Sequence, residues 1–160
     1  MSTEPKMGDR VSESWQSRLG DPPGARADLL LSQTYPAIPE SVAAVRASVA
    51  DATHTHAPPA TIAGVKLAVS EAATNVVVHA YADASEPGLI HVEAVLAGGE
   101  LRVSVTDSGP GLRPRDDAPG LGLGLAIIGE LADKVELLQG GNGGLHVLMR
   151  FAVAPSTTDS

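Results

Sequence analysis

Cysteine is absent from the 160-residue chain, which excludes disulfides, thiolate nucleophiles and zinc sites built on thiolates. Aromatic residues make up only 2% of it, too few for a platform on which single-stranded nucleic acid stacks. Lys and Arg number 11 against 19 Asp and Glu, and the net charge of -8 opposes contact with a phosphate backbone. The chain has no apolar run of membrane-spanning length and no evident signal peptide. We therefore expect a cytoplasmic protein with neither a nucleic-acid nor a membrane partner.

What the chain does have is a hydrophobic content of 43%, mostly Val, Leu, Ile and Ala, which is enough for one packed domain. We place that domain at residues 29–153. Residues 1–28 mix proline, glycine, serine and charges without an evident period, and residues 154–160 are similar, so both ends are predicted to be flexible tails. Trp15, in the first tail, either packs on the domain or on a partner, or has no structural role.

Hydrophobic periodicity divides the domain into strands and helices. The predicted helices are residues 39–53, 59–81 and 122–133, and the predicted strands are residues 29–35, 89–96, 100–106, 135–138 and 145–153. Gly98-Gly99 predicts a tight hairpin, and residues 108–119 a loop. This order predicts an α+β fold, a two-layer sandwich with helices on one face of a mainly antiparallel sheet.

The long predicted helix carries three polar residues at four-residue spacing, Glu71, Asn75 and His79, beside its apolar stripe. A shielded glutamate can accept a proton from a hydroxyl group. An asparagine oxygen is a hard neutral ligand that suits Mg²⁺, and an imidazole can hydrogen-bond to phosphate. Taken alone, the helix favours the simpler interpretation that Glu71 and His79 are solvated side chains along its margin.

Two glycine-containing segments follow. In the first, Asp107 ends a strand and can accept a hydrogen bond from an exocyclic amino group such as adenine presents, while Gly109 and Gly111 permit close approach to a ring. In the second, Gly122 and Gly124 open a helix, where exposed amides and the helix dipole can hold phosphates. The alternatives are an ordinary turn and a hinge. In this order, the three segments predict a nucleotide site.

The motifs Glu71-x-x-x-Asn75-x-x-x-His79-Ala-Tyr81, Asp107-x-Gly109-x-Gly111 and Gly122-Leu-Gly124-Leu resemble those of the ATP-binding superfamily of gyrase, MutL and histidine kinases. The first motif looks like that of the bacterial anti-sigma-factor serine/threonine kinases. The resemblance extends over about residues 29–153.

The resemblance implies a role for each matching residue. Glu71 would be the general base toward a serine or threonine hydroxyl of a protein substrate. Asn75 would bind Mg²⁺ between the ATP phosphates, with His79 nearby. Asp107 would recognise the adenine amino group, and the glycines would shape the nucleotide pocket, Gly109 and Gly111 at the adenine, and Gly122 and Gly124, with their neighbours Leu123 and Leu125, at the phosphates.

It also implies a fold of the histidine-kinase-like ATPase type, possible homodimers, and two protein partners: a sigma factor, and a small anti-anti-sigma antagonist that competes for the kinase and is phosphorylated by it. The chain departs from the family pattern in a short lid loop, residues 112–119, and in the absence of an arginine before the Gly-Leu-Gly core. The last strand also lacks the threonine that many relatives place near adenine. A second hypothesis is therefore a regulatory module that binds ATP or ADP as a switch and transfers no phosphate.

Overall fold

The computed structural model describes residues 26–80, 88–107, 121–139 and 145–153. The described elements follow in the order β1 (Ala27–Pro36), α2 (Pro39–Thr53), α3 (Pro59–Asn75), the π-helix η1 (Val76–Ala80), β2 (Leu89–Ala97), β3 (Glu100–Asp107), α4 (Leu121–Leu131), β4 (Lys134–Gln139) and β5 (Leu145–Ala152). This is the predicted order, with most element ends shifted by no more than two residues. The predicted loop 108–119 lies outside the described residues.

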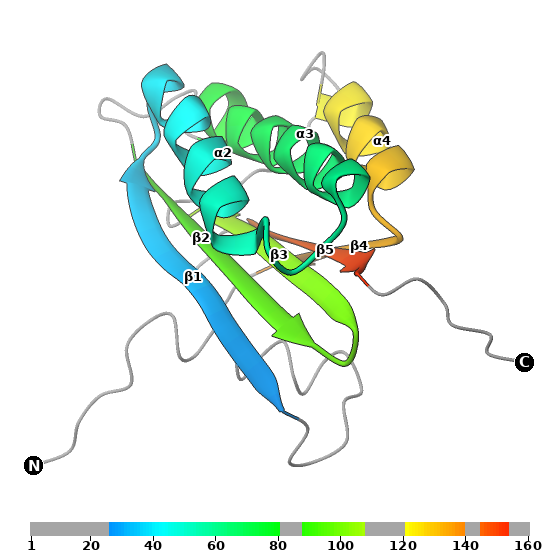
Figure 1. Cartoon of the computed structure of the whole chain (residues 1–160). Helices are drawn as coiled ribbons and strands as arrows, with labels where there is room; N and C mark the ends of the chain where they lie inside the picture. Colours follow the sequence, from blue (N-terminus) through cyan, green and yellow to red (C-terminus); the bar gives the residue numbers. More distant parts are fainter. Residues whose placement is uncertain (1–25, 81–87, 108–120, 140–144, 154–160) are drawn as a thin grey trace, which may run out of the picture.

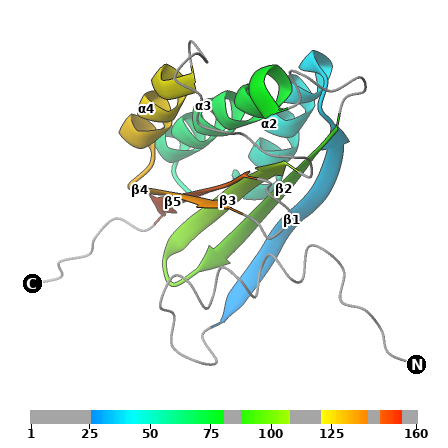
Figure 2. The same ribbon diagram turned by 180° about the vertical axis from the view of Figure 1, so that it is seen from behind.

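The strands form one sheet in the order β1-β2-β3-β5-β4, and each neighbouring pair is antiparallel. Helices α2, α3 and α4 lie side by side on one face of this sheet (Figure 1), and the view from behind shows the same two layers (Figure 2). The predicted two-layer α+β sandwich is confirmed.

Prolines fix where two helices begin. Pro39 and Pro59 each occupy the first helical position, after Ile38 and Pro58 in extended backbone. Proline suits this position because its φ is already helical and its missing N–H would have no partner within the helix. The starts of α2 and α3 could therefore be predicted to the residue.

The end of the second helix differs from the prediction. The sequence predicts one helix to Tyr81, but α-helical bonding ends at Asn75 and a π-helix occupies Val76–Ala80. Tyr81 lies outside the described residues. A π-turn closes i→i+5 hydrogen bonds, and such turns occur frequently at functional sites. Side-chain periodicity does not reveal the change, because Val76, Val77 and Val78 fit either kind of turn.

The core lies between the sheet and the helices. Strand β3 alternates across it, with Leu101, Val103 and Val105 facing the helices and fully buried. Helix α3 packs its apolar side on the sheet. The segment Pro59–Val78 is long and apolar enough to cross a membrane by length and composition alone, but 44% of it is buried inside the protein, as expected for a central core helix.

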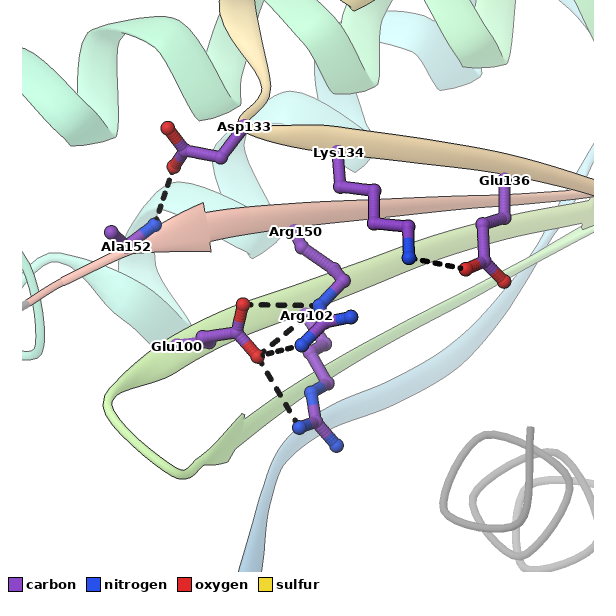
Figure 3. A network of polar contacts seen from close by, with 7 residues as sticks. All are labelled: Glu100, Arg102, Asp133, Lys134, Glu136, Arg150 and Ala152. Atoms are coloured by element: carbon purple, nitrogen blue, oxygen red, sulfur yellow. Dashed lines mark hydrogen bonds and ion pairs between the residues drawn. The ribbon is translucent and has the colours of Figure 1, made fainter. Parts of the chain in front are cut away.

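The opposite face of the sheet carries an ion-pair cluster. Glu100 accepts hydrogen bonds from two arginines (Figure 3): the Nε of Arg150 donates to its two carboxylate oxygens at 3.0 and 3.1 Å, and Arg102 donates at 3.3 Å. Arg102 is almost fully buried, so this carboxylate compensates a charge that is shielded from water. Lys134 and Glu136 form a separate pair at 3.3 Å, in which the lysine is mostly exposed.

We predict that Glu100→Gln lowers the free energy of unfolding by about 1–3 kcal/mol, because it removes a charge that compensates a buried arginine. The control, Glu136→Gln, removes the acid of a single ion pair whose cation, Lys134, is mostly exposed, so no buried charge loses its partner and the free energy of unfolding should change by less than about 1 kcal/mol. Urea unfolding of both variants measures the difference. Equal losses would show that burial adds nothing to the Glu100 cluster.

Candidate functional site

The candidate site begins where the end of α3 meets the start of α4. Asn75, the last residue of α3, is 6% exposed. Gly124, near the start of α4, lies directly against its side chain. A Cβ atom added at Gly124 would lie 3.0 Å from the Oδ1 atom of Asn75 and 3.1 Å from its Nδ2 atom. Any residue larger than glycine at position 124 would therefore displace this amide.

The Asn75 amide is only partly satisfied. Its Nδ2 atom is buried and has no hydrogen-bond partner among the described residues. A buried polar atom without a partner is costly, and in native proteins it often marks a place where an ion, a water molecule or a ligand belongs. Since the two ends of an amide are assigned by their surroundings, the group can present either its nitrogen or its oxygen to a ligand.

Glu71 lies one helical turn before Asn75 and is half-buried. Residues four apart on a helix are neighbours, with Cβ atoms about 5–6 Å from each other. The carboxylate of Glu71 and the amide of Asn75 therefore belong to one edge of α3. A carboxylate and an amide oxygen are chemically suitable donors for Mg²⁺, which keeps several water ligands and needs few from protein.

His79 lies in η1, and its side chain is outside what the structure describes. The π-turn places more residues in each turn than an α-helix does, so the regular spacing that predicted one arc for Glu71, Asn75 and His79 stops at Asn75. The role of His79 stays a prediction.

Asp107 ends β3 and is 1% exposed. Its Oδ2 atom accepts a hydrogen bond at 3.0 Å from the backbone N–H of Leu145, the first residue of β5. This bond holds the carboxylate at the end of the central strand β3, beside the first residue of β5. Strand β3 contacts η1, and α3 contacts α4, so Asp107, Asn75 and Gly124 come from elements that meet.

The contribution of Leu145 was not predicted. From the sequence, the start of this strand was notable only for a missing threonine. The available signal was the pairing of β3 with β5, which brings the beginning of β5 beside the end of β3.

The remaining predicted residues are described in part. Gly109 and Gly111 lie outside the described residues. Gly122 and Leu123 lie in the first turn of α4, and the side chain of Leu123 is not described. Leu125 is half-buried and packs against the core, so any contribution to a phosphate site would come from its backbone.

Comparison with known proteins identifies the family. The model of the histidine kinase-like ATPase domain matches residues 35–151, a range that includes Glu71, Asn75, Asp107 and Gly124. The chain belongs to this family. Within it, similar curated relatives are anti-sigma F factors, and the chain belongs to the anti-sigma-factor kinase family that its motifs indicate.

The anti-sigma F factor of Oceanobacillus iheyensis is 32% identical over 106 residues, which cover 59% of this chain and 71% of the relative. That of Clostridium botulinum strain Alaska E43 is 43% identical over 51 residues, covering 32% of this chain and 35% of the relative. The chain thus spans most of the first relative and about a third of the second.

Two solved structures support the fold. The RsbU and RsbW domains of a Mycobacterium tuberculosis protein match with a TM-score of 0.60 and 28% identity, over 78% of this chain and 33% of that chain. A histidine kinase domain from Erythrobacter litoralis matches with a TM-score of 0.51 and 21% identity, over 95% and 76% of the two chains. The second likeness concerns the fold alone.

We predict that Gly124→Ala weakens ATP binding at least about tenfold, because the new methyl group displaces the Asn75 amide by a few tenths of an ångström or more. Gly129→Ala is the matched control in the same helix, since a Cβ there meets nothing within 4 Å. Both changes raise helix propensity by about 1 kcal/mol. Calorimetric titration with ATP should therefore separate the two variants, and equal affinities would contradict a ligand role for the Asn75–Gly124 contact.

Proposed function

We propose that this protein is an ATP- and Mg²⁺-dependent serine/threonine kinase that acts in the regulation of a sigma factor. The observation that carries the proposal is the buried Asn75 amide against Gly124, with Glu71 one turn away. Membership of the ATPase family supports ATP binding, and the names of the relatives support an anti-sigma role.

In the proposed complex, Asp107 accepts a hydrogen bond from the adenine amino group, beside Gly109 and Gly111. The backbone of Gly122, Leu123, Gly124 and Leu125 donates to the phosphates, because N–H groups at the start of a helix lack partners within it. His79 adds a further contact to the phosphates or their water shell. Asn75 would hold Mg²⁺ through its amide oxygen, and the ion would supply positive charge that offsets that of the phosphates.

Glu71 acts as the general base. As the oxygen of a serine or threonine side chain forms its bond to the γ-phosphorus, the bond from that phosphorus to ADP breaks, and the hydroxyl proton passes to the Glu71 carboxylate. Phosphoryl transfer depends mainly on positioning and charge neutralisation. A single carboxylate that accepts the hydroxyl proton is therefore the only reacting side chain that the mechanism requires.

The proposed protein partners are those that the family resemblance implies. The substrate is a small antagonist of the anti-anti-sigma type, the second partner is a sigma factor, and both compete for one surface. The proposal also includes that the protein forms a homodimer and acts in the cytoplasm.

We predict that Glu71→Gln reduces phosphate transfer to the antagonist by about 10²–10⁴-fold, the usual contribution of a general base, while ATP affinity stays within about threefold. Glu130→Gln, an exposed acid on α4, is the control and should transfer normally. The measurement is radiolabel transfer from ATP to candidate antagonists, with calorimetry for binding.

Two other outcomes are informative. The first is that the unmodified protein binds ATP but labels no candidate antagonist, while its affinity for a partner protein differs between the ATP-bound and ADP-bound forms. The protein is then a nucleotide-controlled binding module. If Glu71→Gln transfers phosphate normally, another group is the base.

We also predict that Asp107→Asn lowers ATP affinity by about 10–100-fold, because a hydrogen bond to a charged group contributes about 1.5–3 kcal/mol. The asparagine oxygen can still accept the N–H of Leu145, so the thermal midpoint should fall by only a few degrees. Titration with ATP, alongside thermal unfolding, tests both parts. An unchanged ATP affinity would remove Asp107 from the adenine pocket.

A further inference from the structure

Two exposed cations on neighbouring helices have no acidic partner among the described residues. Arg46 lies on α2 and Lys66 on α3, and the two helices lie side by side above the sheet (Figure 1). The other Arg and Lys residues of the described ranges each form an ion pair with a carboxylate: Arg26, Arg102, Lys134 and Arg150. In a chain of net charge -8, two such cations form a local positive region that attracts negative charge.

Hydrogen bonds bring both cations to the boundary between α2 and α3. The Nη1 atom of Arg46 donates to the Oγ atom of Ser70 at 3.4 Å, and Ser70 donates to the backbone oxygen of Lys66 at 2.7 Å. Lys66 and Ser70 are four residues apart, so they lie on the same side of α3. A guanidinium group has several N–H donors. The bond to Ser70 therefore leaves others for a carboxylate, which an arginine can bind through two parallel hydrogen bonds.

Next to these cations, α3 exposes a large apolar side chain. Leu67 follows Lys66 in the chain and is 48% exposed. It lies one helical turn before Glu71, so the two side chains are neighbours on the helix surface. Arg46, Lys66 and Leu67 therefore form a surface, here called the α2–α3 patch, that combines positive charge with an apolar side chain and reaches the proposed general base.

The proposed reaction brings its protein substrate to this surface. The substrate hydroxyl must come within about 2.6–3.2 Å of the Glu71 carboxylate to pass on its proton. Lys66 lies about 7.5 Å from Glu71 along the helix axis, a distance that about two or three residues of extended chain cover. Substrate residues close to the acceptor are therefore within reach of the α2–α3 patch.

We propose that the α2–α3 patch docks the protein substrate and selects one that carries an acidic side chain about two to four residues from the acceptor serine or threonine. The acidic group binds between Arg46 and Lys66, and an apolar side chain beside it packs on Leu67. This inference rests on the proposed kinase function and specifies the chemistry of its substrate. The patch determines specificity and takes no part in the transfer itself.

Binding can be tested without phosphate transfer. The probe is a fluorescein-labelled peptide with one serine among Glu and Leu residues, compared with the same peptide carrying Gln for each Glu. By fluorescence anisotropy, the full chain should bind the acidic peptide at least about tenfold more tightly, as expected for hydrogen bonds between charged groups. Arg46→Gln with Lys66→Gln should remove this preference. The control, Arg26→Gln with Lys134→Gln, changes the net charge equally at exposed, paired cations and should keep it.

A kinetic test uses an antagonist protein that the chain phosphorylates. Arg46→Gln with Lys66→Gln, and separately Leu67→Ser, should raise KM several-fold and leave kcat within about twofold, because the patch contributes binding that is equal in the ground and transition states. Leu137→Ser is the control for Leu67, since Leu137 lies on β4 and is also 48% exposed. Its KM should be normal, and equal thermal midpoints would show that all the variants fold.

The two tests distinguish this inference from the kinase function on which it rests. If phosphate transfer occurs but the patch variants have a normal KM, or lose kcat alone, the docking role is overturned and the kinase function stands. Equal binding of the two peptides, or an equal loss of preference in the control pair, also overturns it. If the preference depends on the patch but no antagonist is phosphorylated, the kinase function and the substrate role both fail, and the patch is an acid-binding surface for another partner.

Discussion

The candidate site depends on the close contact between the Asn75 side chain and the backbone at Gly124. It joins the last residue of α3 to the first turns of α4, and no residue with a Cβ atom fits at position 124 without moving the amide. Because Asn75 is buried and part of its amide lacks a partner among the described residues, the contact fixes a polar group that a ligand can complete. Glu71 lies one turn before Asn75 on the same helix. The contact also places the glycine-rich start of α4 against the end of α3.

Strand β3 connects this site to the rest of the protein. Its alternation sends Leu101, Val103 and Val105 into the core below the helices and ends with Asp107 at the sheet edge. The intervening residues, Arg102 and Ser104, face the other side. One short strand therefore holds a candidate ligand-binding carboxylate, the centre of the core and the buried charge of the opposite face. A register shift of one residue would exchange all three, so the Gly98–Gly99 turn, with both residues at positive φ, is a determinant of the site as well as of the hairpin.

Much of the fold followed from local signals. Proline at the first position fixed the starts of α2 and α3, and the period of two identified β2 and β3. The site was predicted as a set of residue types in a given order, and the range matched by the family model includes these residues. Periodicity could not show the π-turn after Asn75, because valines fit both helix types. Nor could it show the bond from Leu145 to Asp107, which depends on two strands separated by 38 residues in the chain. The burial of the sheet face opposite the helices was also missed, since its Glu, Arg and Ser residues have the composition of a solvated face.

That last failure has a physical explanation. Alternating polar residues predict an exposed face when each polar side chain needs water as its hydrogen-bonding partner. Here the polar side chains instead compensate one another across neighbouring strands. Glu100 accepts from two arginines, and His91 contacts the Oγ1 atom of Thr34 at 3.0 Å. Ion pairs in water contribute little because solvent screens them, whereas buried pairs interact more strongly and each unpaired member costs more. The polar composition of this face therefore does not by itself predict exposure, because its side chains have partners on neighbouring strands.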